Sequence, residues 1–187
     1  WHWTQTSIDY APTTFFYLKP DAAALHEFDP ELAQKEVRFA EKEEQSDPVM
    51  RNNSIQGEKM EPFRIDDGLV HPRSFADWKW DEDTHMVWRG AEPGDVMVLR
   101  FKSPEAIPSA ELELQLTRSG NYGNVTISIN GSEEFAFNGY EPEINVKTVE
   151  MSGIDIREGW NLFEVQITGK DPESRSYFFS PDYLMGN

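Results

Sequence analysis

Residues 110–117, with the sequence AELELQLT, decide the fold class of this chain. Leucines occupy positions 112, 114 and 116, and mostly polar side chains occupy the positions between them. Because successive side chains of a β-strand point to opposite faces, this alternation predicts a strand with one buried face and one solvated face. Such half-buried strands are typical of antiparallel sheets that pack on a core with one side only.

Similar strand signals follow one another along the rest of the chain. Turns separate them, and Asn130-Gly131 is the strongest short signal for a type I′ hairpin. No segment after residue 37 shows the 3.6-residue period of an amphipathic helix. We therefore predict an all-β protein of about ten short strands, folded as an antiparallel two-sheet β-sandwich of the jelly-roll type. The strands are expected at residues 37–41, 85–89, 96–101, 110–117, 124–129, 134–137, 146–151, 160–168 and 176–184.

The N-terminal residues have a different character. Residues 13–18, TTFFYL, are rich in β-branched and aromatic residues and predict a strand that ends before Pro20. Residues 21–36 are typical of a linker, so we expect an N-terminal arm over 1–36 and the sandwich over 37–187. The arm is expected to end a preceding domain or to add its strand to a neighbouring subunit. Residues 45–83 lack a clear pattern, as functional loops and edge structure often do.

The chain is strongly acidic. Its 34 acidic and 17 basic residues give a formal net charge of −17, and the sequence pI is near 4.5. This charge repels nucleic-acid phosphates and anionic lipids, so we expect neither nucleic acid nor a membrane as a partner. Neutral glycans, cations and basic proteins stay open, although an acidic surface also serves simply to keep a protein soluble. The absence of cysteine excludes disulfides, thiol catalysis and cysteine zinc sites.

Several motifs follow one another in a definite order along residues 37–185. They are Ala40-Glu41, Pro93-Gly94-Asp95-Val96, the hairpin VTISINGSEEF, the strand GWNLFEV and a final strand with Asp182. This order resembles the galactose-binding-like jelly rolls, a family that includes many carbohydrate-binding modules. The resemblance implies a structural Ca²⁺ held by Glu41 and Asp182, with Glu43 as a third ligand, since calcium prefers oxygen ligands. The alternative is that these acids are solvated side chains of an edge strand.

Three further stretches carry a narrower resemblance. They are LTRSGNYGNVTISING, ITGKDPESRSYFFSPDYL and, near the N-terminus, TSIDYAPTTFFYLKP. The first two resemble the C-terminal β-sandwich of proteins related to glycoside hydrolase family 172, and the third resembles the strand that ends the preceding catalytic jelly roll. Asn121 stands where that family has Asp, and Ser180-Pro181 replaces a Gly-Leu pair. The resemblance implies glycosidase or difructose-anhydride chemistry on furanosides, with the catalytic carboxylates in a jelly roll outside this chain.

Aromatic and polar residues near turns are the candidate ligand-binding residues. Flat rings bind the C–H faces of sugars, and neighbouring polar groups fix the orientation of the ligand. Trp78 and Trp80 alternate in the polar stretch FADWKWDED, so their rings share one face if the segment is extended. The remaining candidates are Trp88, Arg118, Asn121 and Tyr122. The alternative is that the rings fill the core, where we place Phe101, Trp160 and Phe163.

No arrangement of residues is specific enough to name a catalytic group. The 34 acids supply many carboxylate pairs, the four histidines lack zinc-ligand spacing, and there is no G-x-S-x-G elbow. We therefore expect that the chain is not an enzyme by itself. It is expected to be a glycan- or polysaccharide-binding accessory domain of a secreted protein, extracellular or periplasmic. The alternative is a structural sandwich that joins subunits or a neighbouring domain of a family 172-like glycoside hydrolase.

Overall fold

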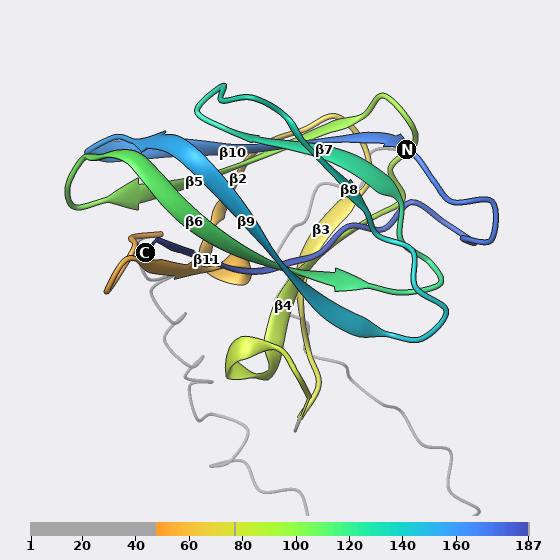
Figure 1. The fold of residues 1–187 in the computed structure, drawn as a ribbon. Coiled ribbons are helices and arrows are strands. Elements are labelled where there is room, and N and C mark those ends of the chain that lie inside the picture. The colour runs from red at the N-terminus through yellow and green to blue at the C-terminus, as the bar shows by residue number, and fades with distance from the viewer. Residues whose placement is uncertain (1–47, 77, 187) are drawn as a thin grey trace, which may run out of the picture. The chain divides into compact units, whose positions relative to one another are not determined.

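A computed structural model describes residues 48–76 and 78–186, which belong to the second of two compact units of the chain, Glu43–Asn187. The predicted strands at 13–18 and 37–41, the linker and the boundary between residues 36 and 37 lie outside the described residues. The described part is an antiparallel two-sheet β-sandwich, which confirms the predicted fold class (Figure 1). No helix within these ranges is long and apolar enough to cross a membrane.

The two sheets of the sandwich contain four and five strands. The four-stranded sheet has the order β1 (Ser54–Gln56), β11 (Pro181–Gly186), β6 (Ile107–Arg118) and β9 (Asn145–Ile156). The five-stranded sheet has the order β2 (Glu61–Ile65), β5 (Val96–Ser103), β10 (Gly159–Gly169), β7 (Asn124–Ile129) and β8 (Phe135–Asn138). A separate two-stranded sheet is formed by β3 (Leu69–Ser74) and β4 (Thr84–Arg89). The described ranges also contain two 3₁₀ helices, η1 (Gly57–Lys59) and η2 (Asp81–Asp83).

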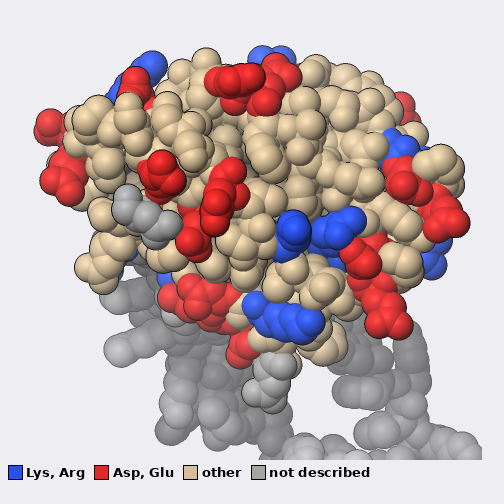
Figure 2. Space-filling view, viewed as in Figure 1, with Lys and Arg blue, Asp and Glu red and all other residues tan. Residues whose placement is uncertain are grey.

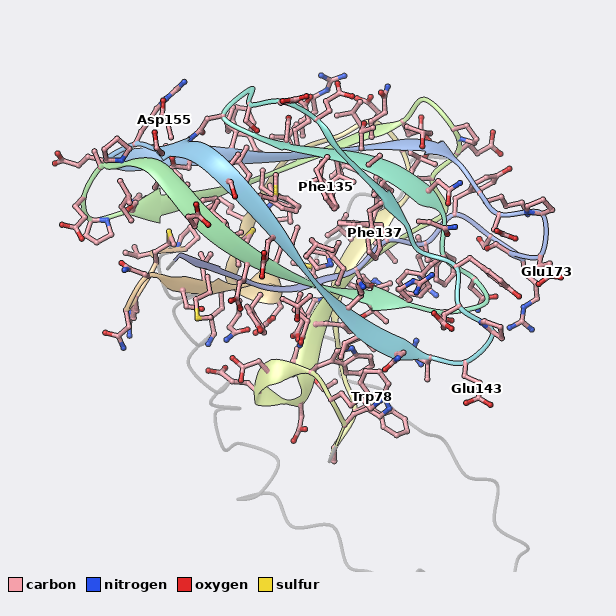
Figure 3. The ribbon with its side chains drawn as sticks, viewed as in Figure 1. Trp78, Phe135, Phe137, Glu143, Asp155 and Glu173 are labelled. Carbon is pink, nitrogen blue, oxygen red and sulfur yellow. The ribbon has the colours of Figure 1, made fainter. Side chains whose placement is uncertain are left out.

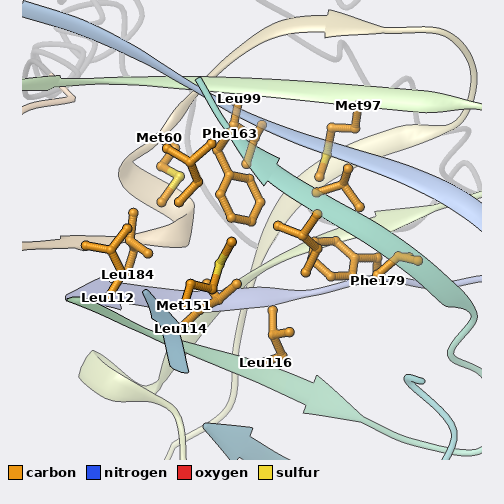
Figure 4. Packing of buried hydrophobic residues seen from close by; sticks show 14 of the residues in the cluster. Met60, Met97, Leu99, Leu112, Leu114, Leu116, Met151, Phe163, Phe179 and Leu184 are labelled. Carbon is orange, nitrogen blue, oxygen red and sulfur yellow. The ribbon is translucent and has the colours of Figure 1, made fainter. Parts of the chain in front are cut away.

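The core lies between the two sheets. Leu112, Leu114 and Leu116 of β6 point inward, as their alternation predicts, and each is at most 1% exposed. They pack in one cluster with residues of the facing sheet that include Leu99 and Phe163 (Figure 4). Full burial of such a side chain contributes roughly 1.5–3 kcal/mol to the stability of the fold. The buried side chains of β5, β6 and β10 therefore hold the two sheets together.

The alternation of side chains along β10 corrects the predicted position of Trp160. Phe163, Val165 and Ile167 point inward and are fully buried, so residues 160, 162, 164 and 166 point outward. Trp160, which we expected in the core, is 41% exposed, and Leu162 beside it is 40% exposed. An aromatic side chain therefore stands on the outer face of the five-stranded sheet.

The hairpin predicted at Asn130-Gly131 is present. Both residues have positive φ, 55° and 75°, as a type I′ turn requires. The Asn130 side chain also fixes the neighbouring strand, because its Oδ1 accepts the Leu162 N–H at 2.9 Å and its Nδ2 donates to Asn161 Oδ1 at 2.7 Å. The turn that follows β7 is therefore also hydrogen-bonded to the neighbouring strand β10.

Candidate functional site

Trp80 is buried, which corrects the exposed position expected from its polar neighbours in the sequence. It is 5% exposed, and its ring stacks on that of His85 with centroids 3.6 Å apart. Its Nε1 donates to Thr117 Oγ1 at 3.0 Å, and His85 Nδ1 lies 2.9 Å from the same hydroxyl. Burial, and then the charge of Arg73, lowers the pKa of His85 to about 3, so the imidazole is neutral. Trp80 therefore anchors the loop between β3 and β4 to β6.

Trp78 keeps part of its ring at the surface. The centroid of its ring lies 4.3 Å from that of Trp80, and its backbone N–H donates to Asp83 Oδ1 at 3.2 Å. Figure 3 shows Trp78 at the lower end of the described residues, away from Phe135 and Phe137. The two tryptophans are thus brought together, as their spacing suggested, but only Trp78 can offer a ring to a ligand. That role stays a prediction.

Two other predicted ligand contacts, Trp88 and Tyr122, are core residues. Trp88 is 0% exposed, and its Nε1 donates to the Asp67 carbonyl at 2.9 Å. Tyr122 is 4% exposed, and its hydroxyl lies 2.9 Å from Ser180 Oγ. Burial raises the pKa of Tyr122 to about 12. Neither ring reaches the surface, so the structure corrects both predicted roles in favour of packing.

Arg118 is the last residue of β6, and Asn121 lies in the loop between β6 and β7. The Arg118 guanidinium donates to the carbonyls of Asn138 and Tyr140 and pairs with Glu141 at 2.6 Å, so it holds the loop after β8. The Asn121 carbonyl accepts the Phe178 N–H at 3.0 Å, and the residue is half-buried. Contact of either side chain with a ligand stays a prediction.

Asp182 is the one predicted calcium ligand that the structure describes, since Glu41 and Glu43 lie outside the described residues. Its buried carboxylate accepts the Asp81 N–H at 3.2 Å and a hydrogen bond from the Gln115 amide. Burial raises its pKa to about 6, although both hydrogen bonds oppose that shift. Within 48–76 and 78–186, no three His, Cys, Asp or Glu side chains could hold a metal ion. These residues alone therefore do not form a calcium site, and Asp182 holds the η2 turn against β11.

An exposed aromatic surface lies on the outer face of the five-stranded sheet. It consists of Phe63 of β2, Arg100 and Lys102 of β5 and Trp160 of β10, and we call these residues the Trp160 platform. Phe63 is 58% exposed. The Arg100 guanidinium carbon lies 5.2 Å from the Phe63 centroid and 4.2 Å from the Trp160 centroid. Lys102 Nζ lies 4.8 Å from the Trp160 centroid.

Glu61 fixes Arg100 within this platform. Arg100 Nε and Nη2 donate to the two carboxylate oxygens of Glu61 at 3.0 and 2.8 Å. This hydrogen bonding lowers the pKa of Glu61 and raises that of Arg100, so both groups stay charged and paired. Because β2, β5 and β10 are neighbours in one sheet, rings and polar groups are held at fixed spacing. The platform combines apolar ring surface with oriented hydrogen-bonding groups, which is the chemistry that a sugar ligand requires.

Comparisons with known proteins support the fold. No family model matches the chain, and no curated protein matches it. A xanthan lyase of Paenibacillus superposes with a TM-score of 0.58 at 16% identity, over 74% of this chain and 13% of the lyase. A family 35 carbohydrate-binding module from an environmental isolate gives 0.47 at 11% identity, over 72% of this chain and 91% of the module. A family 36 module, in complex with calcium and xylotriose, gives 0.45 at 14% identity, over 72% of this chain and 98% of the module.

These similarities define the class of fold and no more. The chain spans a small part of the lyase, and the identities are low, so the likeness shows a shared β-sandwich. The two modules superpose too loosely to carry an argument about ligands.

Proposed function

We propose that this domain binds neutral glycans through the Trp160 platform. The observation that carries the proposal is the pair of exposed rings, Phe63 and Trp160, on either side of an arginine that is already paired with Glu61. Exposed rings of this size on a rigid sheet are costly to leave in water, and such surfaces commonly mark binding sites. Glu61 offsets the charge of Arg100, and the chain as a whole repels acidic polymers, so a neutral glycan fits best.

Each residue has a distinct role in this proposal. The exposed parts of the Trp160 and Phe63 rings pack on the C–H faces of the sugar. Glu61 and Arg100 bind hydroxyl groups beside the rings, where their mutual hydrogen bonds hold them in one orientation. Since the groups are already ordered, little conformational entropy is lost on binding.

The domain is further proposed to act as a non-catalytic accessory domain of a secreted carbohydrate-active protein. The acidic surface and the sugar-binding chemistry of the platform support this role. The motifs that resemble family 172-related proteins are the support for placing it beside a glycoside hydrolase.

A structural Ca²⁺ at Asp182 would need Glu41 and Glu43 as further ligands. A rise in melting temperature on adding calcium after EDTA treatment, lost in Asp182→Asn, would support such a site.

Glycan binding is tested with a panel of immobilised neutral polysaccharides, followed by calorimetry on the best ligand. Loss of a central aromatic contact commonly costs about 2 kcal/mol or more, so Trp160→Ala is expected to weaken binding by about 30-fold. Trp78→Ala serves as a matched control, because it also removes a partly exposed indole but lies outside the platform. Thermal denaturation of both variants shows whether the fold is kept. Loss of binding in Trp78→Ala with no change in Trp160→Ala would place the glycan site at Trp78 and not at the Trp160 platform. Absence of binding to every polymer would reject the proposed function.

A further inference from the structure

A groove runs along the open edge of the sandwich. β8 ends the five-stranded sheet and β9 ends the four-stranded sheet. A hollow of about 440 Å³ lies between the turn before β8 and the middle of β9. We call it the open-edge groove and define it by Glu133, Glu134, Phe135, Glu150, Met151 and Ile154.

The floor of this groove is apolar. Met151 and Ile154 are 5% and 4% exposed and belong to the core cluster, and the partly buried Phe135 of β8 packs against this cluster. Figure 3 shows Phe135 between the two layers of the sandwich. At Gly153 of β9, φ is +71° and no atom lies within 4 Å of the position a Cβ would take, so space is open above the floor. The groove can therefore take an apolar side chain from outside.

The rim of the groove is acidic. Glu133, Glu134 and Glu150 are exposed, and no Lys or Arg lines the hollow. In the part of the chain that the structure describes, none of these three carboxylates pairs with a cation. Figure 2 shows that carboxylates also gather in several patches over the face in view. An incoming positive charge therefore meets unpaired carboxylates beside an apolar floor.

We propose that the open-edge groove binds an extended segment of another protein in which an apolar side chain lies between Lys or Arg residues. The apolar side chain would cover Phe135 and Met151, and the cations would pair with the carboxylates on the rim. A second copy of this chain does not fit, because a symmetric interface would bring the same carboxylates against each other. A glycan fits this groove less well than a peptide does, since the rim offers no exposed aromatic ring. This inference is independent of glycan binding at the Trp160 platform.

The test uses a short fluorescein-labelled peptide of alternating Lys and Leu, with binding measured by fluorescence anisotropy at physiological salt. The combined variant Glu133→Gln, Glu134→Gln and Glu150→Gln is expected to weaken binding at least tenfold. The control variant Glu92→Gln, Glu105→Gln and Glu158→Gln removes the same charge from exposed positions elsewhere and is expected to change affinity less than twofold. Ser152→Arg places a cation at an exposed position of the groove and is expected to abolish binding without touching the core.

Two control peptides separate the groove from general attraction to an acidic protein. A Lys-Ser peptide is expected to bind at least tenfold more weakly, because it lacks the apolar side chain, and a Glu-Leu peptide is expected not to bind. Equal weakening in the two triple variants, equal binding of the Lys-Ser and Lys-Leu peptides, or no binding of the Lys-Leu peptide would each overturn the proposal. Trp160→Ala is expected to bind the Lys-Leu peptide normally, so the two proposals can fail separately.

Discussion

Glu58→Gln is expected to stabilise the domain above pH 7 and to make its unfolding less dependent on pH. Glu58 lies in η1, and its Oε2 is buried without a hydrogen-bond partner among the described residues. Burial is the main reason why its pKa is raised from 4.5 to about 7, and the nearby charges of Asp182 and Glu82 add to the shift. The folded state therefore holds this proton more tightly than the unfolded state does.

The sign and size of the effect follow from that shift. Stability from Glu58 is fully present below pH 4.5 and is lost as the pH rises through about 7, because the carboxylate must then ionise inside the protein. At about 1.36 kcal/mol per pH unit, the loss is roughly 3 kcal/mol. The neutral amide that replaces this carboxyl in the variant cannot ionise. The gap in unfolding free energy between variant and wild type should therefore widen by about this amount with rising pH.

Urea unfolding, followed by tryptophan fluorescence at several pH values between 4.5 and about 8 in EDTA, measures the gap. Glu158→Gln removes an exposed carboxyl in the turn before β10 and is the matched control. Its difference from wild type should stay flat over the same range. If the gap for Glu58→Gln changes by less than about 0.5 kcal/mol, the buried carboxyl is not coupled to folding as the structure implies.

Three further substitutions test other parts of the fold by the same unfolding assay. Leu114→Ala opens a cavity at a side chain that is 0% exposed and should cost about 2–5 kcal/mol. Trp80→Phe keeps a ring on His85 but loses the hydrogen bond to Thr117, and should cost about 1 kcal/mol. Asn130→Ala leaves the Leu162 N–H without its acceptor and puts alanine at φ 55°, so a loss of about 2 kcal/mol is expected. A cost near zero for any of them would mean that its contact contributes little to stability.

The strands from β4 onward could be predicted from the sequence, including the edge strands β8 and β9, whereas the first three strands could not. β6, β7 and β10 bury one face, so their apolar residues alternate, and the predicted span 124–129 is that of β7. The first strands fall within residues 45–83, where we found no pattern. β1 has only three residues, the pairing of β2 with β5 shifts between Pro62 and Arg64, and β3 is mostly exposed. Short, irregular or exposed strands lack the alternation on which the prediction depends.

The candidate site was only partly accessible to sequence reasoning. The polar neighbours of Trp80 suggested exposure, but its burial depends on the pairing of its ring with His85 and on Thr117, which is 37 residues away in the sequence. Trp160 could have been placed correctly, because it alternates in step with the polar residues Glu164 and Gln166, which point outward. Phe63 could not, since its position beside Arg100 follows from the pairing of β2 with β5.

The order of strands separates the two proposed binding surfaces. The Trp160 platform lies on β2, β5 and β10, whereas the open-edge groove is formed by β9 and by the turn that leads into β8, at the opposite end of the five-stranded sheet. They share no residue. Coupling between sites requires that each ligand prefer one of two arrangements of the protein, whereas the described residues pack around one continuous core in a single arrangement. A glycan on the platform and a basic segment in the groove should therefore bind independently, which would let the domain hold a polysaccharide and a protein together.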